Sequence, residues 1–246
     1  MRTLALDIGN TAVKVGCFDG PALREVAAGQ SAEQVRALVQ RWQPRHLIVA
    51  SVVENAALRA DELHELVPGK TLVFDPGTTA IPLRNAYATP GTLGADRLAA
   101  AVGAAGLRPT RNTLVVDAGT ALKCDLVTAD GTYHGGSIAP GLQMRLRALH
   151  AFTGRLPLLA LPPADATIPL TGDSTTGSLL SGAVNGAVAE ITGIVAQYER
   201  RYPALGVLLT GGDAPFLAAR LPARIFVVPE LVLLGLNRIL VYHVEK

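Results

Sequence analysis

The sequence predicts an α/β protein of two similar halves, each with a mixed sheet flanked by helices. Strand-like apolar runs alternate along the chain with segments of helical spacing. In addition, an apolar run that ends at an aspartate and continues into a glycine turn and a lysine occurs at 4–14 and again at 114–123. Two copies of one pattern indicate duplicated halves, because a solenoid would need roughly three or more repeats.

The first copy is typical of a phosphate-binding hairpin. A strand reaches Asp7, Gly9-Asn10-Thr11 forms a tight turn, and a second strand begins near Ala12 and carries Lys14. Glycine and asparagine tolerate positive φ, so backbone N–H groups can converge on an anion. A carboxylate beside such a nest suits a hydrated Mg²⁺ between carboxylate and phosphate. The alternative is an ordinary hairpin whose aspartate only caps the turn.

The second copy favours phosphate binding over the ordinary hairpin. Asp117 matches Asp7, and Gly119 matches Gly9. Thr120 then takes the place of the polar turn residues. One such hairpin is common in structural roles, whereas two in corresponding positions indicate a shared function.

Composition limits the classes of partner. The chain has 246 residues, 49% of them apolar, which is enough for two compact domains with a large interface. A net charge of +2, from 22 basic and 20 acidic residues, gives no attraction to nucleic acid or an anionic membrane. Cys17 and Cys124 lie in predicted strands and suit core thiols of a reducing compartment. We therefore expect small-molecule partners and a cytoplasmic location.

The first half, residues 1–109, is predicted to end in a functional loop and a helix. Strands are expected near 3–8, 12–18, 46–53 and 71–74, and helices at 31–42, with a serine cap, and 54–66. The segment 76–94 is rich in proline and glycine, and loops of this length are usually functional or disordered. We predict a functional loop, with Tyr87 and Thr92 in a small-molecule pocket.

The helix after this loop offers a candidate catalytic base. Gly94-Ala95-Asp96-Arg97 leads into a helix of small residues, so Asp96 and Arg97 lie in its first turn. The helix dipole favours a negative charge there, and we expect Arg97 to be exposed at the domain edge. An ionised carboxylate at a cleft can act as a base. The alternative is that Asp96 is a good first-turn residue and Arg97 its ion-pair partner.

The second half, residues 110–246, is predicted to repeat the mixed sheet. Strands are expected at 113–117, 122–128, 132–138 and 206–210, and helices up to 149, from 174 to 201, from 214, and from 229 to 244. Gly135-Gly136, before the Pro140-Gly141 turn, indicates close approach of the backbone to another surface, which an interface or a ligand would explain equally well. Ser174 or Thr175 caps the long helix in the simplest interpretation. The glycines of Thr210-Gly211-Gly212-Asp213 would let a flat adenosine ring lie against them.

Six short motifs in this order resemble those of the type III pantothenate kinases, within the actin-like and sugar-kinase-like ATPases. They are Asp7-x-Gly-Asn-Thr-x-x-Lys14, Gly94-Ala-Asp-Arg97, Asp117-x-Gly-Thr-Ala121, Gly135-Gly-x-Ile-x-Pro-Gly141, Thr175 with Gly182, and Thr210-Gly-Gly-Asp213. The resemblance implies two RNase H-like domains and ATP-dependent phosphorylation of pantothenate, the first step of coenzyme A synthesis. It also implies a cytoplasmic homodimer.

The resemblance further implies roles for single residues. Asp96 would be the general base, Asp7 would hold Mg²⁺ through water, and Asp117 would bind a monovalent cation, K⁺ or NH₄⁺. The ATP-binding residues would be Asp7, Ile8, Gly9, Asn10, Thr11, Ala12, Val13, Lys14 and Thr120. The substrate-binding residues would be Tyr87, Gly94, Ala95, Asp96, Arg97 and Thr175, the last reaching across the dimer interface.

Lys123 departs from the family pattern, in which threonine is usual at this position. Its ammonium could occupy the position of the monovalent cation at Asp117. The simpler interpretation, favoured by sequence alone, is that Lys123 extends to solvent or pairs with Asp125, which would contribute only about 0–1 kcal/mol.

Two other functions remain open from the sequence. The chain could phosphorylate another small hydroxylated metabolite on the same scaffold, because fold does not fix function. It could also be a non-catalytic ligand-binding regulator derived from a kinase. Such a regulator would be expected to carry a DNA-binding extension or to lack the base, and the sequence has neither feature.

Overall fold

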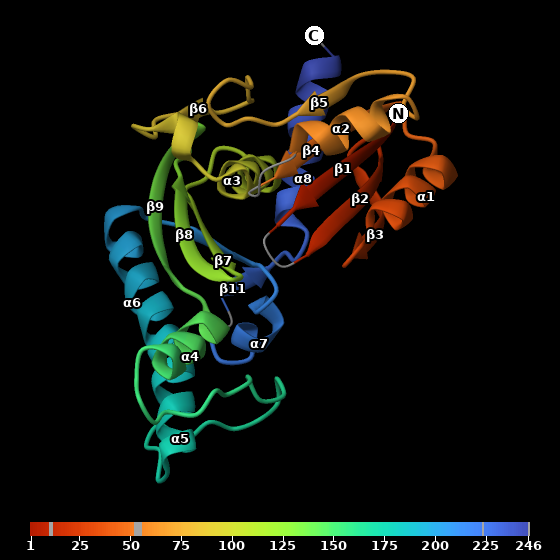
Figure 1. The fold of residues 1–246 in the computed structure, drawn as a ribbon. Helices are drawn as coiled ribbons and strands as arrows, with labels where there is room; N and C mark the ends of the chain where they lie inside the picture. The colour runs from red at the N-terminus through yellow and green to blue at the C-terminus, as the bar shows by residue number, and fades with distance from the viewer. Residues whose placement is uncertain (10–11, 52–55, 223, 246) are drawn as a thin grey trace. The chain divides into compact units, whose positions relative to one another are not determined.

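The computed structural model describes residues 1–9, 12–51, 56–222 and 224–245, with only the backbone of 56–59 (Figure 1). Its contacts divide the chain into two compact units. Unit 1 comprises Met1–Thr110, Val127–His134 and Glu230–Lys246, and unit 2 comprises Arg111–Leu126 and Gly135–Pro229. The division of the sequence at 109 and 110 into duplicated halves stays a prediction.

Unit 1 contains a five-stranded mixed sheet of the predicted kind. Its strand order is β3-β2-β1-β4-β5. The first three strands are antiparallel neighbours, whereas β4 is parallel to both β1 and β5. The strands are β1 (Arg2–Ile8), β2 (Val13–Asp19), β3 (Ala22–Ala28), β4 (His46–Ser51) and β5 (Thr71–Val73).

Four helices belong to the described part of unit 1: α1 (Ala32–Trp42), α2 (Ala56–His64), α3 (Ala95–Leu107) and α8 (Leu231–Val244). The predicted cap of α1 is confirmed, because Ser31 and Gln34 form a reciprocal capping box. The predicted start of α2, at residue 54, lies outside the described residues, as does the predicted end of β4, at residue 53.

The C-terminal helix α8 is held inside unit 1 by close backbone packing. A Cβ at Gly235 would overlap the Ala99 carbonyl group of α3, and one at Gly103 would overlap the Leu231 carbonyl oxygen. Asn237 is 5% exposed, accepts a hydrogen bond of 2.5 Å from Thr3 Oγ1 and donates one of 3.0 Å to Gly20 O. These hydrogen bonds satisfy a buried amide and fix α8 against β1.

The second sheet has the order β11-β10-β7-β8-β9-β6. Its strands are β6 (Arg84–Asn85), β7 (Thr113–Ala118), β8 (Ala121–Val127), β9 (Thr132–Pro140), β10 (Gly206–Thr210) and β11 (Ile225–Val227). Within unit 2, β10 is parallel to β7 and β11, and its five residues are all buried. A run of this kind suits a strand covered on both faces.

The long helix predicted from 174 to 201 is present, with an irregular centre. It consists of α5 (Thr175–Leu180), a π segment (Ser181–Asn185) and α6 (Gly186–Arg201), and Ser174 caps its start. Asn185 Nδ2 donates to Ser181 Oγ and to Pro169 O, so side chains of the π segment fasten the preceding loop. The remaining helices of unit 2 are α4 (Leu142–Ala151) and α7 (Ala214–Ala218).

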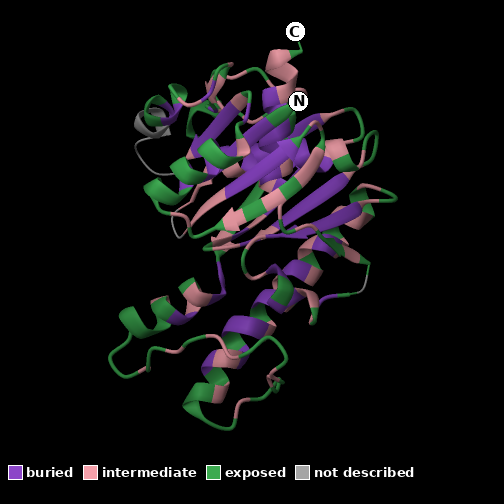
Figure 2. Cartoon of the chain, turned by 90° about the vertical axis from the view of Figure 1, so that its right-hand side faces the viewer, coloured by how far each residue is buried: buried purple, intermediate pink, exposed green. Residues whose placement is uncertain are grey.

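Residues 175–201 are long and apolar enough to cross a membrane by length and composition alone. Ala187, Ile191 and Val195 instead pack into the core of unit 2, with Leu114 and Leu209 of the sheet. In Figure 2 this helix carries buried residues interspersed with exposed ones. Its apolar character is therefore explained by the core, since core helices pass the same test.

Both cysteines are buried thiols, as predicted. Burial raises the pKa of Cys17 to about 11 and that of Cys124 to about 12. Gly136 explains part of the close packing around the second cysteine, because a Cβ there would overlap the Cys124 carbonyl group. The close approach predicted from Gly135-Gly136 was expected at an interface or a ligand. The surface that Gly136 of β9 approaches is instead the Cys124 backbone of β8, in the same sheet.

The α3 and α8 packing predicts the effect of one added methyl group. Gly235→Ala should lower the free energy of unfolding by about 1–3 kcal/mol or more, because two helix backbones must separate. Chemical denaturation of the purified variant measures the change.

Gly193→Ala is the matched control for this prediction. Gly193 is an exposed residue of α6 at which an added Cβ meets nothing within 4 Å. This variant should be stabilised by about 0.5–1 kcal/mol, because alanine restricts the unfolded chain more than glycine does. Equal stability of the two variants would contradict the packing described for α8.

Candidate active site

The first hairpin presents Asp7 at the end of β1. Asp7 pairs in register with Lys14 of β2, so both side chains emerge on one face of the hairpin. Gly9 N donates to Ala12 O over 3.1 Å and begins the turn, as the sequence predicted. Asn10 and Thr11, which were predicted to bind phosphate, lie outside the described residues. Asp7, Ile8, Ala12, Val13 and Lys14 are half-buried.

In the second hairpin, Lys123 forms an ion pair with Asp117. Lys123 Nζ lies 2.7 Å from Asp117 Oδ2, and each side chain is only 13% exposed. The first part of the favoured expectation, that Lys123 extends to solvent, is therefore wrong, whereas pairing with Asp125 stays a prediction. That first part failed because the ammonium meets a carboxylate of the same hairpin, which compensates its charge away from solvent. Lys14 and Asp7 are cross-strand partners in the first hairpin, so the two hairpins share this arrangement.

Two other loops of unit 2 pack against the tip of the second hairpin. Gly141 N donates to Thr120 O over 3.2 Å, and a Cβ at Gly141 would overlap the Gly119 carbonyl oxygen. Gly211 has φ of 95° and packs so closely on Ala118 that any side chain would collide with it. Glycine is thus required at both positions, and the backbone around Asp117 is tightly fixed.

The diglycine of the predicted adenosine motif has two separate roles. Gly211 contacts the hairpin, whereas an added Cβ at Gly212 would meet nothing within 4 Å. Asp213 N donates to Ala118 O over 2.8 Å, and burial raises the pKa of the Asp213 carboxyl group. The exposed glycine is the one against which a flat ring could lie. Thr120 is also exposed, at the tip of the hairpin.

Asp96 lies in the first turn of α3, as predicted. Gly94 is the N-cap, and a Cβ there would meet Asp96 Oδ1 at 2.6 Å. The Arg97 backbone N–H donates to the same carboxylate oxygen over 2.8 Å. The absence of a side chain at Gly94 therefore lets the half-buried Asp96 carboxylate fold over the start of the helix. Ala95 is buried in the core beneath it.

The expectation that Arg97 is exposed is wrong, because its residue is only 5% exposed. The loop before α3 folds back over it. The Arg97 guanidinium carbon lies 5.4 Å from the centre of the Tyr87 ring, and Nη1 donates to Tyr87 Oη over 3.4 Å. This is cation–π geometry for a guanidinium, which stays charged when buried. Asp96, Arg97 and Tyr87 are thereby brought together in unit 1.

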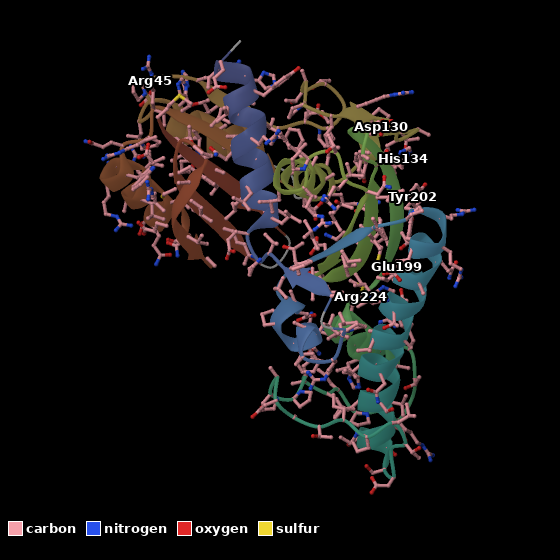
Figure 3. The ribbon with its side chains drawn as sticks, turned by 180° about the vertical axis from the view of Figure 1, so that it is seen from behind. Arg45, Asp130, His134, Glu199, Tyr202 and Arg224 are labelled. Atoms are coloured by element: carbon pink, nitrogen blue, oxygen red, sulfur yellow. The ribbon has the colours of Figure 1, made fainter. Side chains whose placement is uncertain are left out.

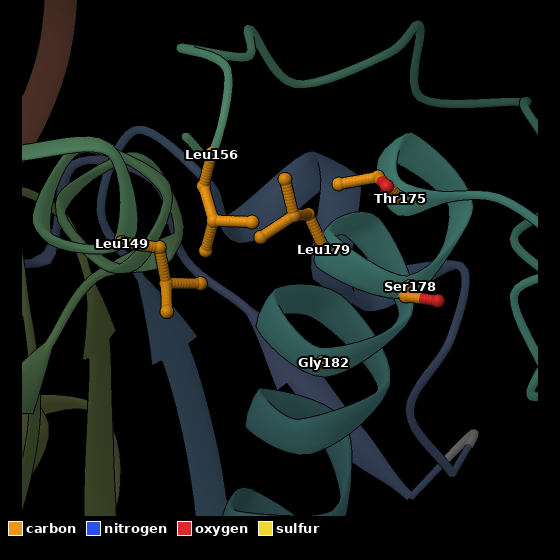
Figure 4. A pocket seen from close by; sticks show the side chains of 6 residues that line it. All are labelled: Leu149, Leu156, Thr175, Ser178, Leu179 and Gly182. Atoms are coloured by element: carbon orange, nitrogen blue, oxygen red, sulfur yellow. The ribbon is translucent and has the colours of Figure 1, made fainter. Parts of the chain in front are cut away.

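Thr175 begins α5 and is exposed at the edge of an open pocket of about 420 Å³ within unit 2. Three leucines, Leu149, Leu156 and Leu179, form its apolar part, and Thr175, Ser178 and Gly182 complete the lining (Figure 4). Both residues of the sequence motif, Thr175 and Gly182, therefore line one pocket.

Metal ligands are few among the described residues, which contain no cluster of three His, Cys, Asp or Glu side chains. The half-buried Asp7 carboxylate is an oxygen donor of the kind that Mg²⁺ prefers, and one carboxylate suffices when nucleotide oxygens and waters supply the other ligands. The donor set of the first hairpin therefore fits a hydrated Mg²⁺.

Sequence reasoning missed Tyr133 and Gly141 as residues that support the site. Gly141 was part of a quoted motif, but its contact with the second hairpin needed coordinates. Tyr133 is fully buried and its ring lies 6.1 Å from that of Tyr87. An aromatic residue within a predicted strand gives no signal of such a contact.

Comparison with known proteins identifies the family. Residues 3–197 match the family model of the type III pantothenate kinases. A type III pantothenate kinase from Cytophaga hutchinsonii is 42% identical over 241 residues, covering 98% of this chain and 99% of that protein. One from Bacteroides fragilis is 43% identical over 242 residues, covering 98% of each.

Solved structures agree on the fold. A protein from Campylobacter jejuni described as a candidate Baf family transcriptional activator has a TM-score of 0.66 and 19% identity, covering 99% of this chain and all of that one. A candidate N-acetylmannosamine kinase from Listeria monocytogenes has a TM-score of 0.53 and 13% identity, with full coverage of both chains. The fold is the α/β fold of the actin-like and sugar-kinase-like ATPases, and the chain belongs to the type III pantothenate kinase family.

Proposed function

We propose that this chain transfers the γ-phosphoryl group of ATP to the primary hydroxyl group of pantothenate, the first step of coenzyme A synthesis. The observation that carries the proposal is identity of 42–43% to type III pantothenate kinases over 98% of the chain. The hydroxyl oxygen attacks the γ-phosphorus, the bond to the bridging oxygen breaks, and ADP leaves. Such a reaction requires mainly positioning and charge neutralisation from the protein.

On the substrate side, Asp96 accepts the proton of the attacking hydroxyl group as general base. Its support is the position at the start of α3, with a carboxylate oriented by the Arg97 backbone N–H. Arg97 and Tyr87 bind pantothenate together with Gly94 and Ala95. A buried guanidinium fork suits polar groups of the substrate better than a mobile surface arginine, because its geometry is already fixed.

On the nucleotide side, the first hairpin binds the phosphates of ATP through its turn and Lys14. Thr120 is the residue of the second hairpin that we assign to ATP binding. Asp7 holds Mg²⁺ through water, and that ion would neutralise phosphate charge. The exposed Gly212 offers a surface for adenosine. The duplicated acid-tipped hairpin is the feature that supports this assignment.

Lys123 takes the place of the monovalent cation in this chain. The related enzymes are expected to bind K⁺ or NH₄⁺ near the equivalent of Asp117, but here an ammonium group already lies 2.7 Å from Asp117 Oδ2. A second cation at the same oxygen would be repelled by it. The described residues therefore fit a bound lysine better than a free ion.

The active form is a cytoplasmic homodimer in which Thr175 contacts the substrate of the other copy. Large apolar side chains between α4 and α5 support association, since Phe152 is 88%, Leu170 is 83% and Leu158 is 58% exposed. Large apolar side chains as exposed as these are candidates for burial against a second copy. The pocket beside Thr175 lies in the same segment of unit 2.

The proposed activity predicts selective turnover of pantothenate. In an ADP-release assay with Mg-ATP, pantothenate should be the preferred acceptor over related pantoyl compounds and simple sugars. Mass spectrometry should find one phosphate on its primary hydroxyl group. Preference for a sugar would favour a different kinase on the same scaffold, and ligand binding without turnover of any acceptor would favour the regulator.

Asp96→Asn should lower kcat by about 100-fold or more while ATP binding is retained, because the amide cannot accept the hydroxyl proton. Steady-state kinetics with calorimetric ATP binding measure both effects. Asp75→Asn is the control, since this exposed carboxylate only accepts local hydrogen bonds from Gly77 and Thr78. Near-natural turnover by a folded Asp96→Asn protein would remove Asp96 from the mechanism.

The Lys123 proposal predicts an unusual salt dependence. The natural enzyme should run equally fast in Na⁺ and K⁺ buffers, whereas Lys123→Thr should be slow until K⁺ or NH₄⁺ is added. Rates measured for both proteins while K⁺ replaces Na⁺ at constant ionic strength show whether they differ in this way. Lys70→Thr is the control, because Lys70 Nζ donates instead to His243 O over 3.3 Å. Many-fold activation of the natural enzyme by K⁺ would end the proposal.

A further inference from the structure

Three side chains of unit 1 form a continuous stack that ends at the substrate arginine. The fully buried Tyr133 ring lies 6.1 Å from the Tyr87 ring, with an interplanar angle of 31°. The Arg97 guanidinium carbon lies 5.4 Å from the centre of the Tyr87 ring. Tyr87 therefore contacts both a buried aromatic ring and a charged group, and its ring links Tyr133 to the Arg97 guanidinium.

The place of Tyr133 in the structure is fixed by the turn before it, residues 128–132. Thr128 Oγ1 donates to Asp130 Oδ1 over 2.6 Å, and Thr132 Oγ1 donates to Asp130 Oδ2 over 3.0 Å. These hydrogen bonds lower the pKa of Asp130 below its ordinary value. His134 Nε2 lies 2.8 Å from Thr128 Oγ1 (Figure 3 labels Asp130 and His134). The start of β9 is thus closed by side-chain hydrogen bonds on both sides of Tyr133.

The loop at 76–94, which carries Tyr87, is attached to β9 at Tyr133. Asn85 of β6 pairs in register with Tyr133, and Ala86 N donates to Tyr133 O over 2.9 Å. Asn85 Oδ1 then accepts a hydrogen bond of 3.0 Å from Tyr87 N, which turns the chain at Tyr87. The backbone and the ring of Tyr133 therefore both support Tyr87, whose side chain contacts the Arg97 guanidinium.

We propose that Tyr133 is a positioning residue for pantothenate binding, acting through the ring of Tyr87 on the Arg97 guanidinium. The proposal rests on the proposed function, in which Tyr87 and Arg97 bind the substrate. Tyr133 contributes a flat, rigid surface that an aliphatic side chain of similar size cannot supply. Without it, Tyr87 samples other ring orientations, and Arg97 loses its fixed direction toward the substrate.

The stack predicts a selective effect on the Michaelis constant for pantothenate. Tyr133→Leu should raise this constant about tenfold, an estimate based on one aromatic pair and one cation–π contact. The Michaelis constant for ATP should stay within twofold. Tyr133→Phe keeps the ring and should retain the natural constant for pantothenate. If Tyr133→Leu does not fold, Tyr133→Met carries the same expectation, because its unbranched side chain adapts better to an irregular space.

Two comparisons separate positioning from loosening of the core. Phe18→Leu removes another fully buried ring from the same hydrophobic cluster and should leave the pantothenate constant unchanged. In a Tyr87→Leu background, Tyr133→Leu should add no further rise, because the contact that transmits its effect is already lost.

The outcomes distinguish this inference from the function on which it rests. If Tyr87→Leu and Arg97→Lys leave the pantothenate constant unchanged, the substrate role of the loop is wrong. If they raise it while Tyr133→Leu does not, only the role of Tyr133 is overturned. An equal rise in Phe18→Leu, or an undiminished effect of Tyr133→Leu in the Tyr87→Leu background, would also overturn it.

Discussion

The ion pair between Lys123 and Asp117 is the interaction on which the nucleotide site proposed at the second hairpin depends. A carboxylate directed at polyphosphate is repulsive unless a cation lies beside it. Here the cation is covalently attached, at 2.7 Å, and is largely shielded from water. The backbone around this pair has little freedom, because Gly141 and Gly211 pack against the hairpin at positions that admit no side chain. The charge of the hairpin is therefore set by the chain itself rather than by the salt around it.

In unit 1 the charge that needs compensation belongs to the buried Arg97. A buried guanidinium cannot lose its proton and must find compensation, which the Tyr87 ring supplies in part. The rigidity of that ring depends in turn on Tyr133 and on the turn closed by Asp130. Of the groups proposed to bind substrate, Tyr87 lies on a loop that is fastened to β9, whereas Asp96 and Arg97 lie in the first turn of α3. Such support is what precise positioning of a reacting hydroxyl group requires.

Much of this arrangement follows from the sequence. Most of the strands, the Ser31 cap, the first turn of α3 and the duplicated hairpin were predicted from periodicity, capping residues and repetition, whereas β3, β6 and β11 were not predicted. The cap of the long helix was left open between Ser174 and Thr175, and the structure has Ser174. The exposure of Arg97 and the direction of Lys123 were not predicted, because both depend on which neighbour a long side chain meets after folding. The repeat already paired each acid with a lysine, so the Lys123 contact had a signal in Lys14 that strand register makes plain. Tyr133 had none.

The central claim, that the Lys123 ammonium replaces a monovalent cation at Asp117, is tested most directly by crystallography with thallium, which substitutes for K⁺ and scatters anomalously. Crystals of the natural protein and of Lys123→Thr would be grown with nucleotide and soaked in the same thallium salt. The account predicts an anomalous peak beside Asp117 in Lys123→Thr and none there in the natural protein. A thallium ion bound to Asp117 of the natural protein, with Lys123 displaced from it, would contradict the claim.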